Sequence, residues 1–329
     1  MELKGKRVLV TGAGGFIGSH LTEELVKMGS KVRALVRYNS DGNIKNLKEL
    51  PKEILNEIEI IRGDLKNYDC VKRAVKDVDV VFHLGALISI PYSYDDPRDF
   101  VETNIIGTLN ILQASREYDV KKVVVTSTSE VYGTAIYSPM NEKHPLQAQS
   151  PYSATKISAD KLAESFYRTY NLPVATIRPF NTYGPRQSMR AVIPTIIYQA
   201  LTNDKIKLGS LSPKRDFNYV KDVVRGFIKV AESDESIGKT INISSGKTIS
   251  IEELVEKIKS IINKEFTIET KDERIRPEKS EVMMLLGDNS EAKNVLGWEP
   301  IYSLEQGLTE VVDYVRNNFD KYKEERENI

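Results

Sequence analysis

The chain has 329 residues, of which 40% are hydrophobic, so it is long enough to form one large domain or two smaller ones. Its 47 basic and 47 acidic residues cancel to a formal charge of zero, which leaves no basic field for a nucleic acid. The single cysteine, Cys70, excludes an intramolecular disulfide framework and suits a reducing compartment.

No segment of the sequence is typical of a membrane protein or a secreted protein. The most apolar run, Val80 to Ile90, is shorter than the roughly 20 residues that a membrane-spanning helix needs. The first residues pass directly into a predicted strand, without the hydrophobic region of a signal peptide. We therefore expect a cytoplasmic protein with neither a membrane partner nor a nucleic-acid partner.

A glycine-rich turn follows the first predicted strand, Arg7 to Thr11. Its glycines have the GxxGxxG spacing, and a helix is predicted from Ser19 to Met28. Glycine allows the tight turn and the close approach of the backbone to a pyrophosphate at the helix N-terminus. This context predicts a dinucleotide site that involves Gly12, Gly15, Phe16, Ile17 and Gly18.

The second predicted strand, Lys31 to Val36, leads to Arg37 where an NAD-binding protein would carry an acidic residue for the ribose. A guanidinium there suits a 2′-phosphate, so we expect a tightly bound NAD(P)+, with NADP+ favoured over NAD+. An arginine stacked on the adenine is the alternative. Two further strands are predicted, Ile58 to Ile61 and Val78 to Leu84, and the candidate cofactor contacts at their ends are Asp64, Leu65, Leu84 and Ala86.

The histidines, acidic residues and cysteine show no metal-ligand spacing, so we predict no metal site. His83 lies inside an apolar strand, where a hydrogen-bonded core histidine is more common than a catalyst. Cys70 is also interpreted as a small core residue.

A long helix is predicted from Asp99 to Tyr118, and it carries two apolar stripes. One stripe can cover the sheet, whereas the other needs a further partner. A helix of a second copy of the chain is one candidate for this partner, so we predict a homodimer. The stripes consist of Phe100, Asn104, Gly107 and Ile111, and of Val101, Ile105, Leu109 and Leu112.

Reactive side chains gather after the valine-rich strand Lys122 to Thr126. Thr128, Ser129 and Glu130 follow it at its carboxyl end, where open α/β sheets bind ligands. Ser150 and Pro151 are typical of the N-cap and first residue of a helix. On that helix Tyr152 and Lys156 lie four residues apart, at the head of an apolar stripe, so both should face the interior: Ala159, Leu162, Ala163, Phe166 and Tyr170 continue the stripe.

These residues suit the oxidation of an alcohol. The unperturbed pKa of tyrosine is near 10, and both Lys156 and a nicotinamide cation would favour the phenolate of Tyr152 as a base. Thr128 is expected to hydrogen-bond the same substrate hydroxyl. Glu130 adds a carboxylate that can remove the proton beside the new ketone, although a capping or surface carboxylate is the alternative interpretation.

From Thr182 onward the sequence predicts a smaller lobe, whose first helix runs from Ile193 to Leu201. We expect residues 1–180 to form an NAD(P)-binding domain, with parts of 216–245 returning to it, and 181–329 to form mainly a nucleotide-sugar-binding lobe. The charged tail, Asp320 to Asn328, is predicted to be a frayed, solvated helix end. The predicted class is α/β: a Rossmann-type, doubly wound parallel sheet with a smaller C-terminal substrate-binding lobe. The other elements expected in this half are the strands Val174 to Arg178 and Thr240 to Ile243, and the helices Val220 to Ala231 and Ile251 to Ile262.

Over its whole length the chain resembles an extended short-chain dehydrogenase/reductase that acts on nucleotide sugars. The matching motifs are Gly12-x-x-Gly15-x-x-Gly18, Tyr152-x-x-x-Lys156 and Arg215-Asp-Phe-x-x-Val-x-Asp222. The triplet Thr128-Ser129-Glu130 resembles that of GDP-mannose 4,6-dehydratases and also that of UDP-glucuronate decarboxylases. Sugar 4-epimerases usually carry a small residue at the position of Glu130.

Two further segments favour a 4,6-dehydratase. Leu35-Val-Arg37 is similar to the NADP-binding turn of GDP-mannose dehydratases, and the segment that begins at Arg276 resembles a dehydratase signature more than a decarboxylase one. Ser150 to Gln187 resembles dehydratases that act on a nucleotide-linked N-acetylglucosamine.

The resemblance implies a redox-neutral lyase that makes a 4-keto-6-deoxy sugar, with Tyr152 as the base at C4 and Glu130 as the base at C5. It also implies that Asn181, Arg186, Arg215 and Arg276 contact the nucleotide diphosphate, although surface salt bridges are an alternative, above all for Arg186. A UDP-glucuronate decarboxylase, a nucleotide-sugar 4-epimerase and a non-catalytic NADP-binding sensor or scaffold remain open.

Overall fold

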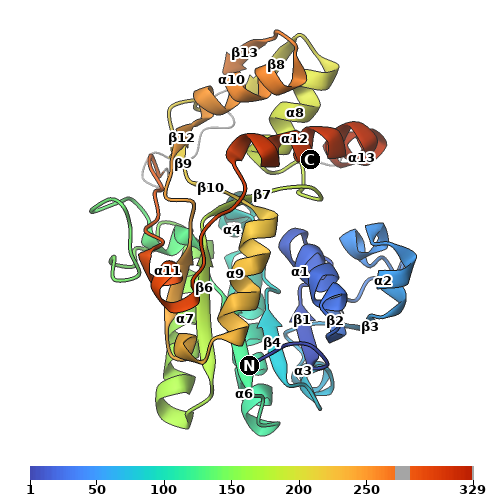
Figure 1. The fold of residues 1–329 in the computed structure, drawn as a ribbon, viewed down its shortest axis with the longest axis vertical. Helices are drawn as coiled ribbons and strands as arrows, with labels where there is room; N and C mark the ends of the chain where they lie inside the picture. Colours follow the sequence, from blue (N-terminus) through green and yellow to red (C-terminus); the bar gives the residue numbers. More distant parts are fainter. Residues whose placement is uncertain (271–281, 328–329) are drawn as a thin grey trace.

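The structure is a computed structural model, which describes residues 1–270 and 282–327. Its centre is a seven-stranded sheet in the order β11-β6-β5-β4-β1-β2-β3, and every pair of neighbouring strands in it is parallel (Figure 1). The predicted Rossmann-type, doubly wound α/β fold is therefore confirmed. The strands are β1 (Arg7–Thr11), β2 (Lys31–Arg37), β3 (Glu59–Gly63), β4 (Val80–His83), β5 (Lys122–Thr126), β6 (Val174–Pro179) and β11 (Thr240–Ile243).

Helices cover both faces of this sheet, because alternate residues of each buried strand point to opposite sides. In β1, Val8 and Val10 pack in one cluster of buried residues and Leu9 packs in another. The first cluster includes side chains of α1 (Phe16–Lys27) and α9 (Val220–Glu232). The second cluster includes side chains of α3 (Tyr68–Val75), α6 (Gly107–Glu117) and α7 (Pro151–Tyr170).

A smaller group of elements lies beyond the carboxyl ends of the strands, in the upper part of Figure 1, and we call it the small lobe. Its helices α8 (Val192–Thr202), α10 (Ile251–Ile262) and α12 (Leu304–Asn317) pack on one another. The strands β8 (Lys205–Leu208) and β13 (Thr267–Thr270) pair in parallel beside them. Although they come late in the sequence, α9 packs on β5 and β6, and β11 pairs with β6 at the edge of the large sheet.

Short elements connect these two parts. Strand β7 (Asn181–Tyr183) pairs with β10 (Phe217–Tyr219), and β9 (Lys214–Arg215) pairs with β12 (Ile249–Ser250). The remaining elements are η1 (Lys45–Glu49), α2 (Lys52–Asn56), α4 (Ile90–Asp95), η3 (Ser129–Tyr132), η4 (Asp234–Ser236), α11 (Ser290–Leu296) and α13 (Phe319–Glu327).

The helix predicted from Asp99 to Tyr118 is not regular. It consists of α5 (Pro97–Phe100), a π-helical segment η2 (Val101–Ile106) and α6. The stripe of Phe100, Asn104, Gly107 and Ile111 is buried, as predicted. The other stripe is split, since Leu112 is buried within the chain and Val101 is exposed.

The prediction of a solvated C-terminal tail is wrong for the first turn of α13. Tyr322 is fully buried there, and its hydroxyl donates to the carbonyl of Gln187 at 2.9 Å. Lys321 forms an ion pair with Glu49 at 2.7 Å. The sequence offers no periodic apolar stripe between Asp320 and Asn328, where Tyr322 is the only aromatic residue.

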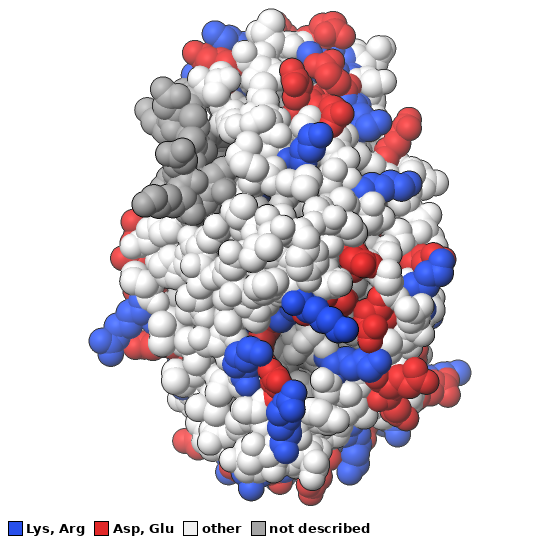
Figure 2. Space-filling view, turned by 90° about the vertical axis from the view of Figure 1, so that its left-hand side faces the viewer, with Lys and Arg blue, Asp and Glu red and all other residues white. Residues whose placement is uncertain are grey.

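The surface carries charges of both signs. On the face shown in Figure 2, Lys and Arg side chains lie interspersed with Asp and Glu side chains in the lower half. None of the described helices combines the length and the apolar character that crossing a bilayer requires.

Candidate functional site

The glycine-rich turn between β1 and α1 forms a cradle from which side chains are excluded. Gly12 has a φ of +67°, and a Cβ there would lie 2.8 Å from the Cα of Gly85. A Cβ on Gly14 would lie 2.8 Å from the carbonyl oxygen of Ile44, and one on Gly18 would clash with the carbonyl oxygen of Gly12. Gly15 is the N-cap of α1, and the first turn of this helix has no acidic residue. The turn therefore fits the pyrophosphate of a dinucleotide, which is attracted by the N–H groups and dipole of the helix.

The other predicted cofactor residues lie at the ends of neighbouring strands. Arg37 is exposed at the end of β2. Asp64 follows β3, and its carboxylate accepts from the backbone N–H of Lys66 at 2.9 Å. The side chain of Leu65 lies where a Cβ on Gly85 or Gly107 would stand, which keeps the loop after β4 close to α6. Leu84 and Ala86, in this loop, are half-buried.

The predicted catalytic helix α7 begins as expected. Ser150 is its N-cap, and the Ser150 hydroxyl accepts from the backbone N–H of Ser153 at 3.1 Å. This cap places Tyr152 and Lys156, both buried, in the first turns of the helix. The Lys156 ammonium donates to the carbonyl of Thr126, the last residue of β5, at 2.5 Å.

The surroundings of Tyr152 disfavour its phenolate in this arrangement. Burial raises the pKa of Tyr152 well above its usual range, a hydrogen bond with Thr128 lowers it, and the Glu130 carboxylate raises it further. Burial also lowers the pKa of Lys156 to about 8, against the opposing effect of Asp160. The Lys156 ammonium is directed at the carbonyl of Thr126. The expected assistance from Lys156 therefore stays a prediction.

The triplet after β5 lies beside this tyrosine. Thr128 caps the short helix η3, and its hydroxyl accepts from the backbone N–H of Glu130 at 3.2 Å. Ser129 is buried and Glu130 is half-buried. The structure thus brings Thr128 and Glu130 close to Tyr152, because both residues shift the pKa of this tyrosine.

A buried polar chain behind Lys156 is absent from the sequence-based prediction. The Asp160 carboxylate forms an ion pair with Arg178 at 2.7 Å, and both side chains are 5% exposed. The same carboxylate oxygen accepts from the hydroxyl of Ser127 at 2.8 Å, and Arg178 donates to the hydroxyl of Tyr132 at 3.0 Å. The chain ties α7 to the residues that follow β5. A signal for it exists in the sequence, because Arg178 lies in an apolar strand and a buried arginine needs an acidic partner.

The buried histidine and cysteine have structural surroundings. The two ring nitrogens of His83 hydrogen-bond the hydroxyls of Thr11, at 2.8 Å, and Thr108, at 3.0 Å. Burial lowers the pKa of His83 to about 3. Cys70 is buried in the core. In the two ranges that the structure describes, no group of three His, Cys, Asp or Glu side chains is arranged to hold a metal ion.

The four predicted substrate contacts are placed differently. Asn181 lies in β7 opposite Phe217, two residues after the buried Arg215, so these two candidates are close in space. The side-chain oxygen of Asn181 is buried, and among the described residues it has no hydrogen-bond partner. Arg186 instead pairs with Glu23 of α1 at 2.7 Å, which favours the salt-bridge interpretation. Arg276 lies outside the described residues.

Comparison with known proteins agrees with this geometry. The profile of the GDP-mannose 4,6-dehydratase family matches residues 9–311. A UDP-glucuronate 4-epimerase of Thermodesulfobacterium geofontis is 32% identical over 96% of this chain and 98% of its own length. A dTDP-D-glucose 4,6-dehydratase of Mus musculus is 31% identical over 97% of this chain and 91% of its own length.

Solved structures give the same result. The crystal structure of the dTDP-glucose 4,6-dehydratase DesIV from Streptomyces venezuelae, with NAD and TYD bound, superposes with a TM-score of 0.88 at 28% identity. The match covers 97% of this chain and 99% of that one. The relatives thus include both epimerases and dehydratases. The fold, the glycine turn and the Tyr-x-x-x-Lys helix agree with a single family that contains both activities. The protein belongs to the GDP-mannose 4,6-dehydratase family of extended short-chain dehydrogenases/reductases.

Proposed function

We propose that the protein is a nucleotide-diphosphate-hexose 4,6-dehydratase that acts on a nucleotide-linked N-acetylglucosamine or a related hexose. The observation that carries this proposal is the position of Glu130, whose carboxylate lies close enough to Tyr152 to shift the tyrosine pKa. Oxidation of an alcohol needs Tyr152 and Thr128 only. A second base beside them is useful when the ketone is an intermediate and the proton on the neighbouring carbon must be removed.

The chain's own residues can carry each proton transfer. Tyr152, as phenolate, takes the proton of the C4 hydroxyl, and Thr128 orients that hydroxyl. The residues of the glycine turn would hold an NAD(P)+, which would supply the redox chemistry as a reversible hydride acceptor for C4 and donor for C6. Glu130 removes the proton from C5, and the C6–O bond breaks as the C5=C6 double bond forms. C5 regains a proton from solvent, which balances the release of the Tyr152 proton.

The leaving C6 hydroxyl must also receive a proton to depart as water. The hydroxyl of Ser129 is too weak an acid to provide it alone. We propose that Glu130 passes on the proton it took from C5, through Ser129 or a water molecule. One proton then leaves C5 and one reaches the C6 oxygen, so the elimination of water is balanced.

We also propose the ligand contacts that this function needs. The residues of the glycine turn, with Arg37, Asp64, Leu65, Leu84 and Ala86, would hold a tightly bound NAD(P)+. Arg37 favours NADP+, because its exposed guanidinium can bind a 2′-phosphate. The small lobe, which is formed mainly by residues from 181–329, would bind the nucleotide sugar. Asn181 and Arg215 belong to the short strands that connect this lobe with the large sheet.

A 4-epimerase is the second candidate, because relatives with that activity match the chain over almost its full length. It would use Tyr152 and Thr128 in the same way and leave Glu130 without a proton to remove. A UDP-glucuronate decarboxylase would lose carbon dioxide from the ketone. A sensor or scaffold would change no sugar at all.

Incubation with a panel of nucleotide sugars, followed by mass spectrometry, separates these functions. The proposed dehydratase releases water from one of them and gives a 4-keto-6-deoxy product. Loss of carbon dioxide would show the decarboxylase, and altered stereochemistry without a change of mass would show the epimerase. Either result would overturn the proposal.

We propose a homodimer formed by the helix that runs through α5, η2 and α6. In support, Val101 and Ile106 on its outer side are 43% and 40% exposed, which is high for apolar side chains. Light scattering at micromolar protein concentration tests this assembly, and a monomer contradicts it.

A further inference from the structure

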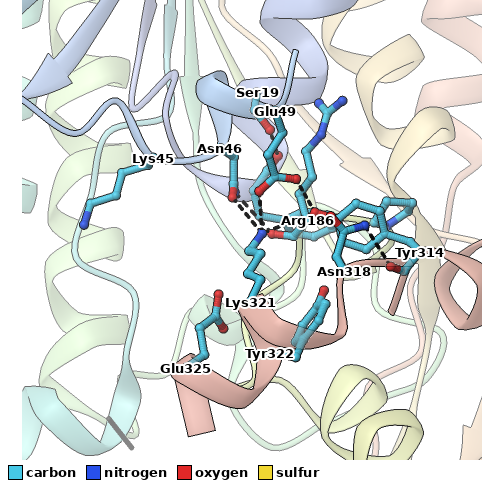
Figure 3. A network of polar contacts seen from close by, with 12 residues as sticks. Ser19, Lys45, Asn46, Glu49, Arg186, Tyr314, Asn318, Lys321, Tyr322 and Glu325 are labelled. Atoms are coloured by element: carbon cyan, nitrogen blue, oxygen red, sulfur yellow. Dashed lines mark hydrogen bonds and ion pairs between the residues drawn. The ribbon is translucent and has the colours of Figure 1, made fainter. Parts of the chain in front are cut away.

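The small lobe touches the cofactor-binding half through the C-terminal helix α13. The Lys321 ammonium reaches the Glu49 carboxylate at 2.7 Å and the side-chain oxygen of Asn46 at 3.2 Å (Figure 3). The hydroxyl of Tyr314, on α12, donates to the other oxygen of the same carboxylate. We call Asn46, Glu49, Tyr314 and Lys321 the tail network. It joins two parts of the chain that are more than 260 residues apart.

The helical segment η1, which carries Asn46 and Glu49, lies directly on the glycine turn. The backbone N–H of Asn46 donates to the carbonyl of Gly14 at 3.1 Å. The carbonyl oxygen of Ile44 occupies the space where a Cβ on Gly14 would stand, at 2.8 Å. A displacement of η1 would therefore move, or release, the carbonyl of Gly14 in the middle of the turn.

The tail network is sheltered enough to hold η1 in place. Lys321 is 23% exposed and Glu49 is 17% exposed, so water competes less for this pair than for a surface salt bridge. The Asn46 side chain also donates to the carbonyl of Arg186 at 3.2 Å, and Arg186 pairs with Glu23 of α1. The Arg186 backbone has a φ of +66°, a left-handed conformation that is unfavourable for arginine and needs support from its neighbours. Three chain segments thus meet at Asn46.

We infer that the tail network positions the glycine turn for the dinucleotide, with Lys321 as a positioning residue that acts through Glu49 and Asn46. The inference rests on the proposed binding of NAD(P)+. It assigns the C-terminal helix a role in cofactor affinity, although this helix extends from the small lobe and not from the sheet that carries the cofactor residues.

Substitution of Lys321 by Met tests this role, because it keeps most of the aliphatic side chain and removes the ammonium. Lys323→Met is the matched control, since it removes the same charge from an exposed position two residues along α13. Loss of a charged hydrogen bond predicts that the dissociation constant of NADP+, or of NAD+ if that is the cofactor bound, rises by about tenfold in Lys321→Met alone. Isothermal titration calorimetry measures it. Hydrogen exchange of residues 39–50 should become faster in the same variant, a change that a merely destabilised small lobe would not produce.

A second variant, Glu49→Gln, keeps a neutral hydrogen bond and should raise the dissociation constant less than Lys321→Met. In the double variant the loss of cofactor affinity should be smaller than the sum of the losses in the two single variants, because Lys321 and Glu49 share one contact. Normal cofactor binding by Lys321→Met overturns the inference, whether or not its melting temperature falls. A wild-type protein that binds neither NAD+ nor NADP+ would overturn the proposed function as well, so the two failures are distinguishable.

Discussion

Glu130 is the residue on which the proposed chemistry depends. Its backbone N–H is held by Thr128 and its carboxylate influences Tyr152, so the acid and the phenol act on the same small volume. The amide of Glu130→Gln has a similar size but cannot accept the C5 proton. The variant separates the two halves of the reaction, because oxidation at C4 does not require this carboxylate.

We predict that Glu130→Gln lowers kcat for water elimination by about two to four orders of magnitude, the usual contribution of a general base. Reduced cofactor should still form, since Tyr152 remains. Glu164→Gln is the control, because this half-exposed carboxylate on α7 pairs with the surface cations Lys161 and Arg168. If Glu130→Gln kept most of its turnover, with exchange at C5 intact in deuterated water, the role of Glu130 would be refuted.

Helix α7 links local sequence to the site, because its N-cap is two residues from Tyr152. In this capping box the hydroxyls of Ser150 and Ser153 each accept from the other residue's backbone N–H, at 3.1 and 3.0 Å. A second capping box, of Ser303 with Gln306, begins α12, far along the chain from the catalytic residues. Ser303 is therefore a suitable control for a substitution of Ser150, because both serines are N-caps of the same type and only Ser150 lies beside Tyr152.

Ser150→Ala should lower the free energy of unfolding by about 1 kcal/mol, as expected for loss of an N-cap. It should also lower kcat by about tenfold, because a frayed first turn misplaces the Tyr152 hydroxyl. Ser303→Ala should destabilise the protein to a similar extent and leave kcat unchanged. Urea unfolding and steady-state kinetics give both quantities, and an equal kcat in the two variants would contradict the prediction.

At the scale of the whole molecule, two histidines whose neutral form is favoured in the folded state should make the stability depend on pH. Burial lowers the pKa of His83 to about 3 and that of His20 to about 4, both below the usual 6.5. Below pH 6.5 the unfolded chain binds protons that the folded chain does not. The free energy of unfolding should therefore fall as the pH drops from 6.5. The stabilising contribution of the neutral His83 should be lost fully only near pH 3.

For His83 alone this loss is about 2 kcal/mol at pH 5, from about 1.4 kcal/mol for each unit between pH 6.5 and 5. The variant His83→Gln, whose amide can still hydrogen-bond Thr11 and Thr108, should lack this part of the pH-dependent loss of stability. Urea unfolding at pH 7 and pH 5 compares the two proteins. The same pH dependence in both would show that His83 is not the group responsible.

Local patterns in the sequence predicted most of the elements. The strands Lys122–Thr126 and Thr240–Ile243 and the helix Ile251–Ile262 have the predicted bounds. Short runs rich in β-branched residues and an amphipathic stripe with a serine cap are local signals that need no distant information. Helix α1 begins three residues before the predicted Ser19, since its N-cap is Gly15 and not a polar side chain. The π-helical segment at Val101–Ile106 has no signature in the periodicity.

The sequence by itself determined the strands and helices of the Rossmann-type core, the glycine turn and the first turn of α7, because each of these elements depends on residues that are neighbours along the chain. Only the tertiary structure decided the long-range polar contacts. The pairing of Asp160 with Arg178, the salt bridge of Arg186 with Glu23 and the contact of Lys321 with Glu49 join side chains from different elements. A charged residue has many possible partners in the sequence, and burial next to one of them selects the pair.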